Sequence, residues 1–287
     1  ERKLDLFKVR NWSDREGIKD VAFLDDGKLL VGACSKDRAQ ILRVLDQQGK
    51  LVSNFEIPAE CAGPLAVSGD RIAVAFDEEV RVLSLATKEV LVAIRGKAGS
   101  IVRGVAFSPS GAQLAFGVDR SGGDDEVTVV DVASSAVVQT LGPFDFGRDG
   151  PLSDVQFSED GTAVAVASAY SVRMFEAATG LERARFEPKV GGSAYALVLG
   201  SLATLDGKLA VPLRGPDVLA RLDWKTATQF APKDLGRHDH PITWSGFGTD
   251  GAIVTSADST IRTWDAAGVP RATFEAQNSS PIVVTKQ

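Results

Sequence analysis

Cysteine and histidine are both scarce in this sequence, and their scarcity excludes several kinds of site. The 287 residues contain two cysteines, Cys34 and Cys61, and two histidines, His238 and His240. Two thiols provide neither a framework of several disulfides nor a four-thiolate zinc site, although a single bridge between them remains open. Two imidazoles likewise leave little material for histidine-dependent chemistry. We therefore expect no metal centre and no cofactor.

Positive charge is also limited, and long apolar segments are absent. The net charge is -6 at pH 7, with 32 Lys and Arg against 38 Asp and Glu, and the basic residues form no stripe. Binding to a nucleic-acid backbone depends on such a stripe, so nucleic acid is not an expected partner. No segment approaches the roughly 18 uninterrupted apolar residues of a membrane-spanning helix. No signal-peptide pattern opens the sequence, and we expect a cytoplasmic protein without membrane contact.

A repeated pattern runs through the whole sequence. Phenylalanine is followed four residues later by glycine in the segments FLDDG, FSPSG, FSEDG and FGTDG, and weaker copies, VSGD and TLDG, lie between them. The six turn glycines are Gly27, Gly69, Gly111, Gly161, Gly207 and Gly251. Each interval holds four apolar runs separated by polar turns. This order predicts four antiparallel strands joined by hairpins in every unit, and no helix of useful length.

The first two strands expected in each unit indicate how the units assemble. Segments such as 101–107 and 113–118 are nearly continuously apolar, a pattern typical of strands that are buried on both faces. A sheet of about 40 residues cannot cover both of its own faces, so neighbouring units must stack on one another. Stacking around an axis produces a β-propeller.

The last unit resembles the WD40 repeat. It reads SADSTIRTWD from Ser256 to Asp265, and His238 occupies the place of the histidine in the family's Gly-His pair, with Arg237 in place of the glycine. The other units depart from the family pattern, because Leu45, Leu83, Val130, Phe175 and Leu222 stand where tryptophan is expected. The resemblance implies an all-β, WD40-like β-propeller of four-stranded antiparallel blades. It covers residues 1–287 as a single domain, which we expect to be part of a longer chain or complex.

The number of blades is open at this point. Six blades are visible in the sequence, and residues 3–9 and 281–286 each read as one more strand. These two ends predict a partial seventh blade that would close the ring and leave no sheet edge exposed. A closed six-bladed ring is the alternative.

The resemblance also implies a structural role for four residues of the last unit, namely His238, Ser256, Asp258 and Trp264. In WD40 repeats, the carboxylate of the turn forms a hydrogen-bonded chain with the imidazole, the hydroxyl and the indole N–H. Ser, His and Asp are also the residue types of a hydrolase triad. A buried carboxylate without donors is costly, however, so a network that satisfies itself is the stronger interpretation. We therefore predict no catalytic residues, and a protein that is not an enzyme.

Two segments contain residue types that bind metal ions. His238-Asp239-His240 is one local turn with no further histidine to complete a ligand set. Asp119 to Glu126 offers oxygen ligands, but it lacks the spacing of a known calcium loop and contains Arg120. We interpret the first as a structural histidine beside two solvent-facing residues. The second is interpreted as a solvated hairpin loop.

The longest predicted loops point to a partner-binding face. In WD40-like propellers the connections between the second and third strands, and those between blades, open on the same face. Aromatic residues and arginine surrounded by charge are typical of protein interfaces. The predicted contact residues are Phe144, Phe146, Arg148, Asp149, Tyr170, Arg120, Asp124, Asp125 and Trp12. The alternative for Phe144 and Phe146 is burial beneath their own loop, with at least one of the two buried.

An arginine recurs at one position of the third strand. The four residues are Arg43, Arg81, Arg173 and Arg262. We interpret them as surface residues whose stems cover neighbouring apolar side chains.

These observations favour a non-catalytic scaffold or a sensory, regulatory module that binds another protein or another domain of the same polypeptide. Similar propellers in bacteria are often attached to NTPase, kinase or caspase-like domains, and the alanine-rich, lysine-poor composition fits a bacterial source. The first alternative is a propeller hydrolase or lyase with a site in the central channel, although the innermost strands begin with mostly apolar residues. The second alternative is an architectural or oligomerisation module. Fold alone does not decide between them.

Overall fold

The computed structural model describes most of the chain. The described residues are 17–24, 26, 28–34, 40–46, 50–57, 63–76, 78–96, 99–120, 125–190, 193–194, 202–205, 207–213, 218–233, 244–247, 253–257, 260–265 and 269–275. They form strands β1 to β26 and one short helix, α1. In this part of the chain, no helix is both long enough and apolar enough to cross a membrane.

Six four-stranded antiparallel sheets account for most of the described elements, one for each predicted repeat, and we number them as blades one to six. Blades one and two comprise β1 (Gly17–Phe23), β2 (Leu29–Cys34), β3 (Gln40–Leu45) and β4 (Leu51–Ile57), then β5 (Leu65–Ser68), β6 (Arg71–Phe76), β7 (Glu79–Ser84) and β8 (Val90–Arg95). Blades three and four comprise β9 (Ser100–Phe107), β10 (Gln113–Arg120), β11 (Asp125–Asp131) and β12 (Val137–Phe144), then β13 (Leu152–Phe157), β14 (Ala163–Ser168), β15 (Val172–Glu176) and β16 (Glu182–Phe186).

The remaining elements complete the last two blades and the connections. Blades five and six comprise β19 (Ala203–Leu205), β20 (Lys208–Leu213), β21 (Val218–Leu222) and β22 (Gln229–Lys233), then β23 (Trp244–Phe247), β24 (Ile253–Ala257), β25 (Thr260–Trp264) and β26 (Pro270–Glu275). The helix α1 (Phe146–Asp149) joins blades three and four, and a hairpin of β17 (Lys189–Val190) and β18 (Ser193–Ala194) follows blade four.

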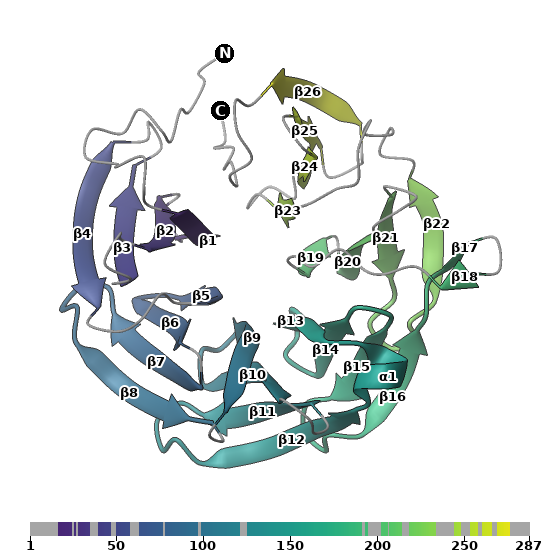
Figure 1. The fold of residues 1–287 in the computed structure, drawn as a ribbon, viewed down its shortest axis with the longest axis horizontal. Coiled ribbons are helices and arrows are strands. Elements are labelled where there is room, and N and C mark those ends of the chain that lie inside the picture. The colour runs from purple at the N-terminus through teal and green to yellow at the C-terminus, as the bar shows by residue number, and fades with distance from the viewer. Residues whose placement is uncertain are drawn as a thin grey trace.

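The blades follow one another around a central axis, with the first strand of each blade innermost and the fourth outermost (Figure 1). The protein is therefore a WD40-like β-propeller, as the repeats predict. The positions of the repeat tryptophan, such as Leu45 and Trp264, lie at the ends of third strands. The chain ends that predict a partial seventh blade lie outside the described residues, so the number of blades in the complete ring stays a prediction.

The glycine turns explain the regularity of the repeat. Gly69, Gly111, Gly161 and Gly207 join the first two strands of their blades and have φ between 57° and 70°. This left-handed conformation is strained for residues with a Cβ atom, which is why glycine recurs at this position.

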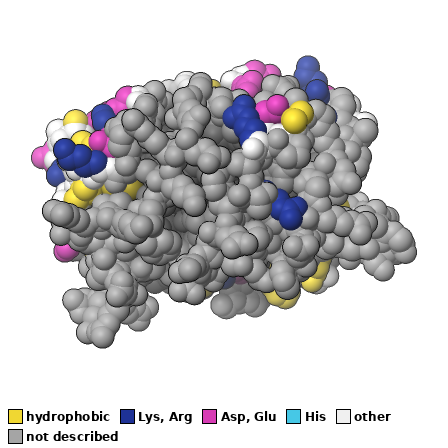
Figure 2. Space-filling view, turned by 90° about the horizontal axis from the view of Figure 1, so that it is seen from above, with side chains coloured by type: hydrophobic (Ala, Val, Ile, Leu, Met, Phe, Trp, Pro, Cys, Tyr) yellow, Lys and Arg dark blue, Asp and Glu magenta, His cyan; other side chains and the backbone are white. Residues whose placement is uncertain are grey.

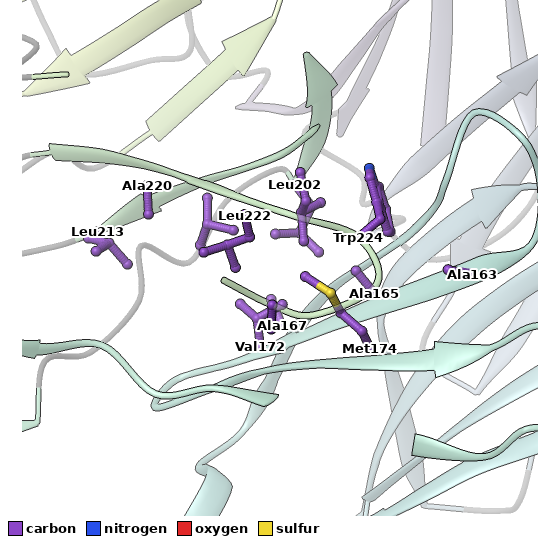
Figure 3. Close-up of a cluster of buried hydrophobic side chains, with 13 residues drawn as sticks. Ala163, Ala165, Ala167, Val172, Met174, Leu202, Leu213, Ala220, Leu222 and Trp224 are labelled. Carbon is purple, nitrogen blue, oxygen red and sulfur yellow. The ribbon is translucent and has the colours of Figure 1, made fainter. Parts of the chain in front are cut away.

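The hydrophobic core lies between blades rather than within one. Four clusters of buried side chains each combine residues of two successive blades, from blades one and two through to blades four and five. In the last of these, Val172 and Met174 of β15 face Leu222 and Trp224 of blade five (Figure 3). Each fully buried side chain of this size contributes roughly 1.5–3 kcal/mol, so each sheet depends on its neighbours for stability.

Burial differs between the first and second strands of a blade, which corrects one expectation. The second strand β14 is buried at every residue, and β6 at every residue after Arg71. The innermost strands β5 and β13 include partly exposed residues. The inner strand is the edge of its sheet nearest the propeller axis, so it is not buried throughout (Figure 1).

Blades three and four approach closely near the axis. A Cβ atom added to Gly104 of β9 would lie 2.7 Å from Cα of Asp154 and 2.8 Å from the backbone nitrogen of Val155 in β13. Only a residue without a side chain fits this contact between two backbones.

Candidate functional site

The connection between blades three and four contains a single helical turn. Asp145 follows the last residue of β12, and its Oδ1 atom accepts a hydrogen bond from the backbone N–H of Arg148 at 2.9 Å. This is the arrangement of an N-capping residue, and it fixes the start of α1. The sequence predicts a loop here, and the structure adds a short helix to it.

Phe144 lies inside the protein rather than on the predicted surface. Its side chain is fully buried, and its ring centroid lies 5.8 Å from that of Phe175 in blade four. The guanidinium carbon of Arg173 is 4.3 Å from the Phe144 ring centroid, a cation–π contact. Phe144 therefore anchors the connection to blade four, and of its two predicted roles the structure supports burial.

The interpretation of the recurring arginine as a surface residue is wrong for Arg43 and Arg173, since both are 6% exposed. Arg173 forms the more extensive set of contacts. Its Nε and Nη2 atoms donate to Oε2 of Glu182 at 2.8 and 2.5 Å, and Nη1 donates to the carbonyl of Pro143 at 2.6 Å. A buried guanidinium requires partners for its donors, and these come from two different blades. Arg81, by contrast, is partly exposed and pairs with Glu79.

Asp149 is the buried centre of a polar network. It is 2% exposed, and its carboxylate accepts hydrogen bonds from Ser171 Oγ at 3.0 Å, Arg185 Nη1 at 3.1 Å and the Asp145 backbone at 3.1 Å. The Oγ atoms of Ser168 and Ser171 are 3.1 Å apart, which extends the network into β14. Asp149 thus ties the connection between blades to the β14–β15 turn and does not itself contribute an exposed contact.

This network parallels the one predicted in blade six. Asp149, Ser168 and Ser171 come from the connection between blades, the second strand and the turn after it. These are the positions that the sequence predicts for His238, Ser256 and Asp258. Three donors occupy the Asp149 carboxylate, so the geometry favours a structural role over activation of Ser171.

Glu182 joins the same network from β16. Burial alone would raise its pKa, but the hydrogen bonds from Arg173 and Arg185 outweigh burial and hold the pKa of Glu182 below its usual value. The carboxylate therefore stays charged at neutral pH and pairs with both arginines. The result is a connected set of ion pairs beneath α1.

Three side chains project from this support. Phe146 is 61% exposed, Tyr170 is 43% exposed, and the side chain of Arg148 is 67% exposed. The Tyr170 backbone N–H donates to the carbonyl of Asp149 at 3.0 Å, and a Cβ atom at Gly150 would lie 2.9 Å from Tyr170 Cε2. We call Phe146, Arg148 and Tyr170 the α1 surface. All three belong to the contact residues predicted from the sequence, and the structure places the connection and the turn side by side.

The acidic segment of blade three is more ordered than expected. β10 continues to Arg120 and β11 begins at Asp125, so less of the segment is available as a loop. Asp125 is 1% exposed and pairs in register with Phe144, which removes it from the exposed surface. Asp119 Oδ2 accepts from Arg103 Nε at 3.0 Å. The side chain of Arg120 and all of Asp124 lie outside the described residues.

Several other predicted residues fall beyond the described part of the chain. These are Trp12, His238 and Asp258, together with the His-Asp-His segment and Cys61. Ser256 and Trp264 are described in β24 and β25 by their backbone alone. The hydrogen-bonded network of blade six therefore stays a prediction.

Two carboxylates on the innermost strands, those of Asp20 and Asp154, were not predicted from the sequence. Asp154 Oδ1 accepts from the Val155 backbone at 2.8 Å, and Oδ2 accepts from the Leu202 backbone of the next blade at 2.5 Å. In the same way, Asp20 Oδ2 accepts from the Leu65 backbone at 2.8 Å. Burial, with a smaller effect from the charge of Asp20, raises the pKa of Asp154 to about 8 against the two backbone hydrogen bonds.

The sequence does contain a signal for this pair. Asp20 and Asp154 each stand three residues before the phenylalanine that precedes the glycine turn, Phe23 and Phe157. The strand starts interpreted as apolar were Val21 and Val155, and each aspartate stands one residue earlier. Each carboxylate binds a backbone N–H of the following blade, which indicates that it joins two blades at the axis.

Charges of both signs are mixed on the visible surface. In the edge-on view of Figure 2, acidic and basic side chains of the described residues lie beside one another along the upper rim. Within the described ranges, His, Cys, Asp and Glu side chains form no group of three that could hold a metal ion.

Comparisons with known proteins identify the fold alone. No protein-family model and no curated protein matches the sequence. Among solved structures, a chain of the "Crystal Structure of Mitotic Checkpoint Complex" matches with a TM-score of 0.67 and 17% identity, over 86% of this chain and 73% of that chain. In total, 1212 chains of solved structures match, so the fold is widespread and does not by itself define a function.

Proposed function

We propose that this propeller is a non-catalytic protein-binding module, and that the α1 surface is its contact site. The observation that carries the proposal is the exposure of Phe146 and Tyr170 above a buried ion-pair network. Large aromatic side chains and arginine dominate the binding energy of protein interfaces. A support that is already ordered also reduces the entropy lost on binding. The similar chain, from a structure described as a complex, is consistent with this class of function.

A pull-down from cells that make the protein tests the proposal. Immobilised wild type is compared with a Phe146→Ala/Tyr170→Ala double variant, and bound proteins are identified by mass spectrometry. We expect about 10-fold or greater loss of specific partners in the double variant, because two aromatic anchors are removed. Leu181→Ala is the matched control, since Leu181 is 66% exposed on blade four outside the α1 surface. Equal capture by wild type and the double variant would contradict the proposal.

The innermost strands support a second candidate, a hydrolase or lyase with a site near the propeller axis. Asp20 and Asp154 supply two carboxylates on these strands, and a carboxyl group with a raised pKa is suited to general acid catalysis. Both carboxylates, however, accept hydrogen bonds from backbone N–H groups of the next blade, which favours a structural role. A hydrolase activity abolished by Asp154→Asn in a folded protein would reverse this order of the candidates.

A further inference from the structure

Glu187 lies between two arginines at the edge of the α1 surface. It follows β16, and its Oε1 atom is 3.7 Å from Nη2 of Arg148 and 3.5 Å from Nη1 of Arg185. The hydrogen bonds that Arg173 and Arg185 donate to Glu182 are shorter, at 2.5–3.2 Å. Glu187 is therefore held loosely, in contrast to the carboxylates beneath α1.

The two exposed charges of this ion pair are compensated unequally. Glu187 contacts both guanidinium groups, but within the described residues the only ion pair of Arg148 is the 3.7 Å contact with Glu187. Asp145 is also exposed, but its Oδ1 atom accepts a hydrogen bond from the backbone N–H of Arg148 at the start of α1. The guanidinium of Arg148 thus keeps most of its donors for an acceptor from outside the chain.

We propose that the α1 surface binds an acidic side chain of a protein partner, which takes the place of Glu187 between Arg148 and Arg185. This inference rests on the proposed function and names the chemistry of the partner. An exposed contact as long as those of Glu187 contributes little stability, so Glu187 can rotate into water. A guanidinium that a partner covers requires an acceptor, and carboxylate oxygens match its planar set of donors.

The neighbouring aromatic side chains add a second requirement. Phe146 precedes Arg148 by two residues in α1, and Tyr170 lies beside Gly150, directly after this helix. Both aromatic side chains are exposed, so a partner that covers the α1 surface must supply apolar contacts as well as an acid. The expected ligand is a segment in which Asp or Glu lies close to an apolar residue.

Selection from a random peptide library displayed on phage tests both requirements. Peptides are selected on the wild type and then screened for loss of binding to the Phe146→Ala/Tyr170→Ala double variant, which identifies those that bind the α1 surface. We expect these peptides to contain Asp or Glu beside an apolar residue more often than the unselected library does.

Two charge variants then separate the acidic contact from the aromatic one. In titrations with a selected synthetic peptide, Arg148→Ala should weaken binding about 10-fold, because the acid loses its main partner. Glu187→Gln removes the competing carboxylate at nearly the same size and should strengthen binding about 2- to 5-fold. Replacing the acid of the peptide by its amide should abolish the difference between the wild type and Glu187→Gln.

The controls distinguish a failure of this inference from a failure of the proposed function. Arg95→Ala should leave binding unchanged, since Arg95 is 83% exposed on blade two and pairs with Glu79 outside the α1 surface. Arg148 and Glu187 are exposed, so their variants should keep the wild-type melting temperature. Selected peptides that depend on both aromatic rings but show no excess of acid, or that bind Glu187→Gln no better than the wild type, would overturn this inference alone. A selection without any peptide that depends on the two rings would contradict the proposed function itself.

Discussion

Asp154 joins blades four and five near the propeller axis, because its Oδ2 atom accepts a hydrogen bond from the backbone nitrogen of Leu202 at 2.5 Å. Asp20 makes the corresponding contact with Leu65 between blades one and two. Each of these two blade boundaries thus contains the same kind of carboxylate–backbone hydrogen bond in addition to its hydrophobic cluster. The carboxylate of Asp154 loses much of its hydration in this position, which is why burial raises its pKa to about 8.

This raised pKa predicts how stability depends on pH. Its ordinary value is 3.8, so between about pH 4 and 8 the folded chain holds a proton on Asp154 that the unfolded chain releases. The free energy of unfolding must then fall as pH rises through this window, by at most about 1.4 kcal/mol per pH unit. Asn cannot titrate, so Asp154→Asn should remove this part of the slope.

Urea denaturation of wild type and Asp154→Asn at pH 5.5 and pH 7.5 measures the difference. All other titrating groups contribute equally to the pH dependence of both proteins, so the difference between the proteins gives the contribution of Asp154. Identical changes with pH in the two proteins would show that Asp154 does not titrate in this window.

Removal of the buried Asp149 carboxylate should be strongly destabilising. Asp149→Ala removes the acceptor that Arg185 and Ser171 share, although Arg185 keeps its pair with Glu182. Each buried donor left without an acceptor costs about 1–3 kcal/mol. Arg148→Ala is the control, because Arg148 is exposed and its nearest pair, Glu187 at 3.7 Å, is a surface contact worth about 0–1 kcal/mol. Similar losses in the two variants, measured by urea denaturation, would mean that the network is not a buried ion-pair system.

The two phenylalanines near α1 should behave oppositely. Phe144→Ala removes a fully buried ring that contacts Phe175 and Arg173, and a loss of about 3–5 kcal/mol in unfolding free energy is expected. Phe146 is 61% exposed, so Phe146→Ala should change stability by about 0.5 kcal/mol or less. Thermal or urea denaturation compares them directly. A large loss for Phe146→Ala would place that side chain in the core and weaken the case for the α1 surface.

The local features of the fold were predictable from the sequence, because each is dictated within one repeat. The turn glycines and the order of four strands in each unit both follow from short-range patterns of apolar residues and turns. The location of the α1 connection and Tyr170 on the same face was also predictable, since it depends only on the face of the propeller on which each loop lies.

Contacts between blades were predicted less well. Arg173 reads as a surface residue from its strand alone, and its burial depends on Phe144 and Pro143 from another blade. Asp149 reads as a loop residue for the same reason, because two of its partners, Ser171 and Arg185, lie 22 and 36 positions further along the chain. Such partners become visible only when the stacking of the sheets is known.

The close approach of blades three and four makes Gly104 sensitive to substitution. An Ala Cβ atom would lie 2.7 Å from Cα of Asp154, and because this neighbour is backbone, one blade must move relative to the other. A forced shift in a packed interior typically costs about 1–3 kcal/mol, so Gly104→Ala should lower the free energy of unfolding by that amount. Gly63→Ala is the matched control, since its nearest neighbour would be the Val102 carbonyl at 3.5 Å, an ordinary contact. If urea denaturation shows both variants close to wild type, the innermost strands are not packed as tightly as these distances require.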